Sequence, residues 1–187
     1  MEQDTLMAPS EALTRGFVLE QPLAVGAAAS PRGTAVTASA AGARVRQGFR
    51  VGGLNLMVRY EDGSELTEMP EVFRLPNVPG WFRGIANLHG MLTPVFDLSR
   101  YLGVAPDSAA RQMLLVLSHG ANAAGMVIDG LPQRLRWTSA QDADAGAAPP
   151  KLASQVRGAA LIGEQLWFDI ESAALLDALE QAMAGLH

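Results

Sequence analysis

The sequence predicts a mainly β fold, built as small barrels with short helices and one C-terminal helix. Short apolar runs recur along the 187 residues and are separated by glycine-containing turn sequences, a spacing typical of strands in small barrels. Pro70, Pro76 and Pro79 exclude a long helix from this part of the chain. Together these observations favour small barrels over a doubly wound parallel sheet.

A folded domain is expected over residues 46–184, after a tail of different composition. Ala24–Arg44 contains mostly alanine, glycine, serine and threonine, with little apolar surface to bury. We therefore expect residues 1–45 to form a flexible Ala/Gly-rich N-terminal tail. The folded domain should keep its stability when that tail is removed.

The first expected element is a hairpin. Gly48–Tyr60 alternates apolar and polar residues around Gly52-Gly53, which predicts two short strands and a tight turn. A further strand is expected over Ser64–Met69.

A second hairpin is expected in the middle of the chain. The apolar runs Gly84–Leu88 and Met91–Phe96 flank His89-Gly90, so we expect Gly90 to adopt a positive φ. Pro94 lacks a backbone N–H, which predicts that the second run lies at a sheet edge or a bulge.

A short helix should follow this hairpin. Asp97 fits its N-cap, Leu98–Leu102 its one or two turns, and Gly103 its end. The remaining expected elements are strands over Gln112–Ser118 and Ala123–Ile128, a turn at Asp129-Gly130, a loop over Ser139–Pro150, a hairpin of Gly158–Ile162 and Gln165–Phe168, and a final helix capped by Asp169.

A faint internal repeat relates the middle hairpin to the last one. Arg83-Gly84 leads through the first to Phe96-Asp97-Leu98, and Arg157-Gly158 leads through the second to Phe168-Asp169-Ile170. The repeat predicts two related β subdomains, each closed by a helix.

No set of residues predicts catalysis, a cofactor or a metal site. The chain has no cysteine, and the sequences GxxxxGK[ST], GxGxxG, GxSxG and HExxH are absent. Its three histidines are His89, His119 and the C-terminal His187. Asp97 and Asp169 are interpreted as helix caps, and Lys151 as a loop residue after two prolines. We therefore expect a protein that is not an enzyme.

Two other functions are weighed. A degenerate receiver domain would take its acidic pair from Leu56–Asp62, its phosphoacceptor from Asp97 and its lysine from Lys151, but three prolines interrupt its first helix. A small β-barrel that binds a ligand or nucleic acid would use aromatic and basic surface. The chain has 6% aromatic residues and a net charge of −5, so nucleic acid is not an expected partner.

The expected location is the cytoplasm. The chain contains no run of 18 apolar residues that could span a membrane, and its first residues, MEQDTLM, lack the basic start of a signal peptide.

The run Val78–Gly103 is similar to the core motif of the CheW-like domain family. That motif has a proline, a tryptophan, a Gly-x-x-Asn-Leu-Arg-Gly hairpin, Pro-Val-x-Asp-Leu and a short helix. The matching positions are Pro79, Trp81, Gly84, Asn87, Leu88, Gly90, Pro94, Val95, Asp97 and Leu98. Met113–Trp137 resembles the family's next hairpin, and Val156–Leu176 its last hairpin and helix.

The resemblance implies two SH3-like five-stranded β-barrel subdomains around a shared core, with no catalysis and no cofactor. It implies an adaptor that couples the cytoplasmic tip of a methyl-accepting receptor to the regulatory domain of a CheA-like histidine kinase. Such a protein meets the membrane only through the receptor. The Ala-rich tail and the histidine in the turn are compatible with the PilI-type branch, which serves pilus-linked chemosensory systems.

The resemblance also implies where partners bind. In the family the receptor tip lies in the groove between the barrels, near the Asn-Leu-Arg-Gly turn, and the kinase domain binds at a barrel end through apolar contacts. The turn falls on Asn87, Leu88, His89 and Gly90, and the family's strand glutamate on Glu68. His89 takes the place of the usual arginine. Because histidine titrates near neutral pH, binding at this turn can vary with pH where arginine would not.

Overall fold

The computed structural model describes residues 42–185, so the expected tail lies outside the described residues except for positions 42–45. The strands are β1 (Arg44–Val51), β2 (Leu54–Val58), β3 (Gly63–Glu68), β4 (Val72–Phe73), β5 (Phe82–Leu88), β6 (Met91–Asp97), β7 (Gln112–Leu117), β8 (Ala124–Trp137), β9 (Asp142–Ala143), β10 (Val156–Ile162) and β11 (Gln165–Ile170). The helices are α1 (Leu98–Leu102) and α2 (Ser172–Ala184), with short 3-10 turns such as η2 (Gly120–Asn122). The prediction of a mainly β fold with few helices is confirmed.

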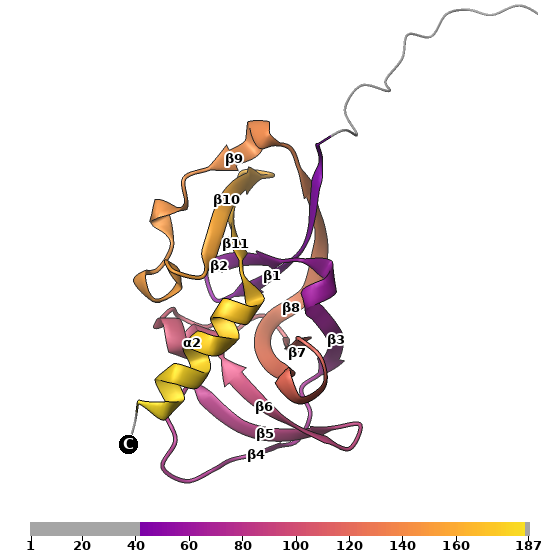
Figure 1. The fold of residues 1–187 in the computed structure, drawn as a ribbon, viewed down its shortest axis with the longest axis vertical. Helices are drawn as coiled ribbons and strands as arrows, with labels where there is room; N and C mark the ends of the chain where they lie inside the picture. The colour runs from indigo at the N-terminus through magenta and orange to yellow at the C-terminus, as the bar shows by residue number, and fades with distance from the viewer. Residues whose placement is uncertain (1–41, 186–187) are drawn as a thin grey trace, which may run out of the picture. The chain divides into compact units, whose positions relative to one another are not determined.

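The strands of the described residues form one 11-stranded sheet. Hydrogen-bonded neighbours follow the order β4-β5-β6-β8-β1-β2-β11-β10-β9, while β7 pairs with β8 and β3 pairs with β7. Figure 1 shows β4, β5 and β6 at the bottom, β9 and β10 at the top, and α2 between them in this view. This path is open, with β4 at one end and β9 at the other. The expected closure into two barrels is therefore not seen in the strand pairing.

The first hairpin follows the predicted pattern. Val51 pairs with Leu54 across the glycine turn. The strand begins at Arg44, before the expected start of the folded domain at residue 46, because residues 44–48 pair with β8. Residues 44–45 therefore belong to the folded domain rather than to the tail.

β5 and β6 form the predicted middle hairpin, with φ angles of 52° at His89 and 86° at Gly90. Two positive φ angles give a tight turn whose twist matches that of the flanking strands. The edge position expected from Pro94 is not found, because β6 lies between β5 and β8. Its pairing with β8 begins only at Val95, however, so Pro94 does not enter that ladder.

Asp97 caps α1 as predicted. Its Oδ1 accepts hydrogen bonds from the backbone N–H of Arg100 at 3.2 Å and from Ser99 Oγ at 2.6 Å. Gly103, with φ of 72°, ends the helix. Oδ2 of Asp97 faces the guanidinium groups of Arg83 and Arg100, both at 3.3 Å. One buried carboxylate therefore holds the helix against β5.

The turn predicted at Asp129-Gly130 is wrong, because β8 continues through both residues. Strands pair with this strand on both sides of the two residues: β6 and β7 with its part up to Asp129, and β1 with Asp129 and with residues 133–137. Gly130, with φ of 74°, lies where the partners change. A positive φ at that point bends the strand without ending it. β8 therefore joins the two halves of the sheet.

The internal repeat is visible in the strand pairing. The β5–β6 and β10–β11 hairpins each have a register shift at an arginine, Arg83 in one and Arg157 in the other. The second strand of each hairpin then pairs in parallel with another strand, β6 with β8 and β11 with β2. The two halves of the sheet therefore share one local plan.

The two copies of the repeat end differently. The prediction that Asp169 caps the final helix is wrong, because β11 stays paired as far as Ile170 and the N-cap of α2 is Glu171. Asp169 instead forms an ion pair with Arg46 of β1, whose Nε lies 2.9 Å from its Oδ1. The same residue type thus caps a helix in one copy and ties two strands together in the other.

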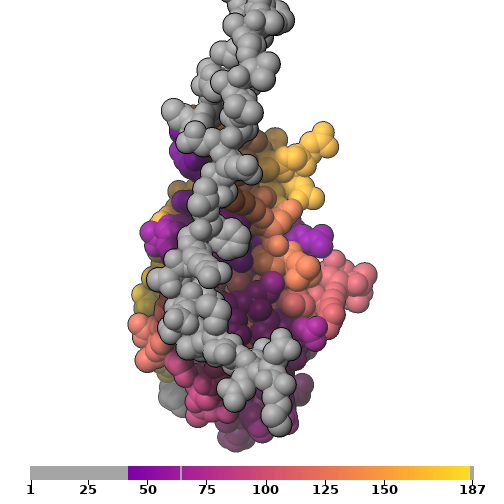
Figure 2. Space-filling view, turned by 90° about the vertical axis from the view of Figure 1, so that its right-hand side faces the viewer, coloured from indigo at the N-terminus to yellow at the C-terminus, as the bar shows by residue number. Residues whose placement is uncertain are grey.

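The main buried cluster draws on both halves of the sheet and on both helices. Leu175 and Leu179 of α2 are fully buried, as the spacing of apolar residues predicted. Phe82 is buried, whereas its neighbour Trp81 is half-buried and stacks on Phe96 with 6.1 Å between the ring centroids. On the face drawn in Figure 2, residues from the early part of the described chain (indigo to purple) lie beside residues from its central part (pink to orange).

Candidate partner-binding surface

The turn between β5 and β6 is built by local hydrogen bonding. Oδ1 of Asn87 accepts a hydrogen bond from the backbone N–H of Gly90 at 2.8 Å. Leu88 pairs with Met91 at the end of the ladder. This leaves His89 as the residue at the tip, with a side chain that is 80% exposed. The structure therefore brings the four residues proposed for the turn together on one projecting element.

His89 contacts a glutamate of β3. Its Nε2 lies 3.0 Å from Oε1 of Glu65, whose side chain is 34% exposed. The contact becomes an ion pair when the imidazole is protonated and is otherwise a neutral–charged hydrogen bond. The tip of the hairpin is therefore tied to β3 by one side-chain contact.

Glu68, the glutamate proposed from the resemblance, is not brought to the turn. Its Oε1 lies 2.7 Å from Nη2 of Arg111, and both side chains are 70% exposed. Glu65 and Glu68 are three positions apart on a strand and so face opposite sides of it. Sequence reasoning missed Glu65 because the register of β3 decides which glutamate meets the hairpin. That register is set by pairing with β7 and includes an irregularity near Glu65.

A small pocket of about 150 Å³ lies beside the turn. Its walls come from β3, the β5–β6 hairpin, β7 and the η2 turn with its flanking residues. They are Glu65, Leu88, His89, Met91, Thr93, Val116, His119, Gly120 and Ala123. His119, interpreted from the sequence as a turn residue, therefore shares this pocket with His89.

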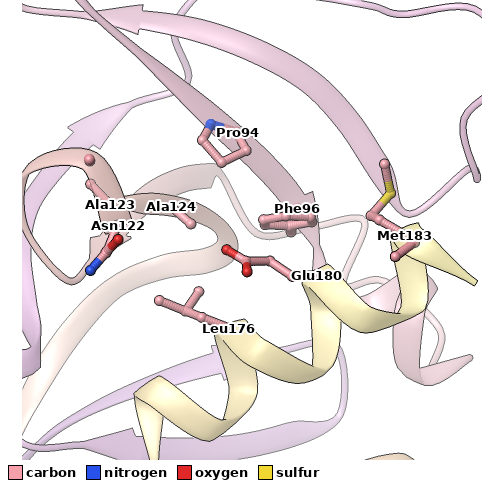
Figure 3. A pocket seen from close by; sticks show the side chains of 10 residues that line it. Pro94, Phe96, Asn122, Ala123, Ala124, Leu176, Glu180 and Met183 are labelled. Carbon is pink, nitrogen blue, oxygen red and sulfur yellow. The ribbon is translucent and has the colours of Figure 1, made fainter.

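A larger pocket of about 390 Å³, lined mainly by apolar side chains, lies between β6, the η2 turn and α2. Figure 3 shows Phe96 and Pro94 of β6 on one side and Leu176 and Met183 of α2 on the other. Glu180 is the one carboxylate that lines it. Ala123 lines this pocket and the one beside the turn, so the two hollows adjoin.

Sequence reasoning did not predict the larger pocket, because its walls come from three segments that are far apart in the chain. The available signal was the width of the apolar stripe on α2. Leu176 and Met183 are seven positions apart and belong to one apolar stripe with Leu175 and Leu179, which are fully buried in the core. When a helix carries more apolar side chains than the core can cover, the remaining ones can line a second surface such as this pocket.

The acidic residues and the lysine weighed for catalysis have structural contacts. Asp97 caps α1, and Asp169 pairs with Arg46. Nζ of Lys151 donates a hydrogen bond to the backbone O of Tyr101 at 2.6 Å and lies over the ring of the same tyrosine. Asp97 is 3% exposed, and the sheet is not the doubly wound parallel sheet of a receiver domain. The receiver alternative is therefore excluded.

Asp129 is the acid whose titration is most clearly altered. It is 5% exposed, and burial raises the pKa of its carboxyl group, while a hydrogen bond from the backbone N–H of Gly52 lowers that pKa in part. This contact ties the β1–β2 turn to the bend in β8.

Residues 42–185 contain neither a candidate metal site nor a candidate membrane-spanning helix. No cluster of three or more histidine, cysteine or acidic side chains there could hold a metal ion. Neither of the helices in that range is long and apolar enough to cross a membrane.

Comparison with known proteins gives consistent matches. Protein PilI of Pseudomonas aeruginosa is 34% identical over 83 residues, which are 44% of this chain and 47% of PilI. Chemotaxis protein CheW of Klebsiella aerogenes is 28% identical over 123 residues, which are 64% of this chain and 73% of that protein. The chain therefore spans about half the length of PilI and a larger share of CheW.

The fold and the family agree with these matches. The crystal structure of the scaffolding protein TtCheW from Thermoanaerobacter tengcongensis has a TM-score of 0.58 at 17% identity, covering 68% of this chain and 88% of that chain, which shows a shared fold. The model of the CheW-like domain matches residues 47–180. These residues include the middle hairpin, the long strand β8 and most of α2, and on this match the chain belongs to the CheW-like domain family.

Proposed function

We propose that this protein is a non-enzymatic adaptor that couples a methyl-accepting receptor to a CheA-like histidine kinase, in a chemotaxis or pilus-linked signalling system. The family match over residues 47–180 carries this proposal. The names of the relatives, a chemotaxis protein and PilI, support it. Such an adaptor works in the cytoplasm and meets the membrane through its receptor.

For the fold, we propose that the two halves of the sheet act as two SH3-like barrel subdomains. It is supported by the repeated hairpin plan and by β8, which pairs with β6 and β7 in one half and with β1 in the other. Two subdomains that share one strand would hold two partner surfaces at a fixed distance, which is what an adaptor requires.

We assign binding of the receptor tip to the turn Asn87–Gly90 and to the larger pocket between β6, the η2 turn and α2. The turn projects, and the next residues, Met91 and Leu92, are 45% and 74% exposed. Exposed apolar side chains beside a polar tip are typical of a protein contact. Glu68, on the exposed side of β3, is kept as a peripheral contact, and the kinase domain is placed elsewhere, at a barrel end.

The test uses His89→Ala and His89→Arg, with binding to a receptor cytoplasmic fragment and to the kinase measured separately at pH 6 and pH 8. We expect His89→Ala to weaken receptor binding and to leave kinase binding unchanged. We expect His89→Arg to remove the difference between the two pH values, because arginine stays charged at both. The matched control is Glu164→Ala, since Glu164 lies in the corresponding turn of the last hairpin and also has a positive φ, 64°.

Two outcomes would contradict these proposals at different levels. If both His89 variants bind and activate like the parent at each pH, the turn is not part of the interface. If neither a receptor fragment nor a CheA-like kinase binds the parent chain, or if the pure protein hydrolyses ATP or phosphorylates itself, the adaptor function itself is wrong.

A further inference from the structure

A second type of pocket lies beside the edge strand β4, and none of its residues belongs to the surface assigned to the receptor. It measures about 190 Å³ and is lined by three arginines together with apolar side chains and one glycine. The residues are Arg74, Leu75, Val78, Pro79, Gly80, Phe82, Arg83 and Arg100. The three basic residues come from three separate segments: the residues after β4, strand β5 and helix α1.

The positive charge of this pocket is only partly balanced. Arg83 and Arg100 share one carboxylate oxygen, Oδ2 of Asp97. Arg100 also donates a hydrogen bond to the backbone O of Gly80 at 3.3 Å. Arg74 is exposed and makes no ion pair or side-chain hydrogen bond with any residue between 42 and 185. Two of the three guanidinium groups therefore share a single carboxylate, the third pairs with none among the described residues, and donor groups remain free because each guanidinium carries five N–H bonds.

The geometry of the pocket favours a carboxylate carried by an extended peptide. Guanidinium groups bind carboxylates through paired N–H donors, and apolar walls suit the methylene groups of a glutamate side chain. Phe73 and Leu75, on either side of Arg74, are 57% and 43% exposed. Among the described strands β4 pairs only with β5, so its other edge is open to a further strand.

We propose that the Arg74–Arg83–Arg100 pocket binds an acidic side chain of a partner protein, presented by an extended segment that lies along the open edge of β4. The segment places a glutamate or aspartate between the arginines and apolar side chains against Phe73 and Leu75. This proposal does not depend on the adaptor function, because it concerns other residues than the surface assigned to the receptor and rests on their own charges.

The experiment uses the full chain and two synthetic peptides, acetyl-Ala-Glu-Phe-Glu-Ala-amide and its counterpart with both glutamates replaced by glutamine. Binding is followed by NMR through the backbone amide signals of Gly80 and Gly84 and the side-chain Nε–H signals of the three arginines. We expect the acidic peptide to shift these signals and the glutamine peptide not to. Arg74→Gln should weaken binding by about fivefold, the size of one partly exposed charge pair.

Arg136→Gln is the matched control, because Arg136 is also exposed and has no ion pair with a described residue. Inorganic phosphate at equal ionic strength tests for a site that takes any small anion. The proposal is overturned if the two peptides bind equally, if Arg136→Gln weakens binding as much as Arg74→Gln, or if phosphate produces the same shifts while the acidic peptide does not bind. It is also overturned if Arg74→Gln binds like the parent.

Discussion

Gly84 is the position in the middle hairpin where one added methyl group should cost the most stability. Its φ is +132°, a conformation that residues with a side chain rarely adopt. A Cβ built at this position would overlap the backbone O of Phe73 and would lie 2.8 Å from the Phe73 carbonyl carbon. Both atoms belong to the backbone of β4, so rotating a side chain cannot relieve the overlap.

Gly84→Ala is therefore expected to lower the free energy of unfolding through two effects. The positive φ costs about 1–2 kcal/mol. Relief of the overlap requires β4 to move away from β5, which loses the pairing of Val72 with Ala86 and of Phe73 with Ile85, at about 1 kcal/mol for each hydrogen bond. The sum is about 3–4 kcal/mol, which corresponds to a fall in Tm of about 10 °C for a domain of this size.

Gly90→Ala separates the two effects. Gly90 lies in the same hairpin with φ of +86°, but a Cβ there meets nothing within 4 Å. Only the φ cost of about 1–2 kcal/mol applies, so Tm should fall by roughly 5 °C. Gly90→Val should cost at least as much, since a β-branched residue is poorly tolerated at positive φ.

Thermal unfolding followed by circular dichroism measures these differences, and urea unfolding gives the free energies. If Gly84→Ala unfolds at the same temperature as Gly90→Ala, the close approach of β4 to β5 does not exist in solution and the reasoning fails. An unchanged Tm for Gly90→Val would show that the turn does not have the positive φ described.

Two further predictions concern buried acids. Asp97→Ala should lower the free energy of unfolding by about 3–5 kcal/mol, because it removes the α1 cap and leaves two guanidinium groups without their shared carboxylate. Urea unfolding measures this change. The control is Glu68→Ala, which breaks an exposed ion pair and should lower the free energy of unfolding by less than about 1 kcal/mol. Asp129→Asn keeps an acceptor for Gly52 but removes the charge. Because burial raises the pKa of Asp129 above its ordinary value of 3.8, the parent loses stability as the pH rises from that value through the folded-state pKa, and the variant does not. The stability of Asp129→Asn relative to the parent should therefore increase with pH across this window and then level off, and a flat difference would contradict the assigned burial effect.

Elements whose signals are local could be predicted from the sequence. The turns at Gly52-Gly53 and His89-Gly90 were predicted because the residues that permit positive φ stand between two apolar runs. The α1 helix was predicted because Asp97 and Gly103 supply its cap and its end. These signals act within a few residues and do not depend on the rest of the fold.

Elements that depend on distant partners could not be predicted in the same way. Asp129-Gly130 has the composition of a turn, but β1 and β7 both pair with Asp129, so β8 bends at Gly130 without ending. Asp169 has the composition of a cap, but it is held in β11 by pairing with β10. The same limit applies to the candidate surface: the turn at Asn87–Gly90 was located from the resemblance, whereas its contact with Glu65 depends on the register between β3 and β7.

The two copies of the internal repeat explain where the pockets lie. Both copies keep the arginine register shift and the parallel pairing that follows it, so these parts serve the fold. They diverge after the second strand. In the first copy the aspartate begins a five-residue helix, which brings Arg100 beside Arg83 and forms one side of the arginine pocket. In the second copy two more residues pass before a 13-residue helix begins, and that helix lines the apolar pocket beside β6. The two copies share their hairpins and differ in the helices that follow them. The arginine pocket and the apolar pocket therefore differ in chemistry because each is lined by the helix of its own copy, which is not held by strand pairing.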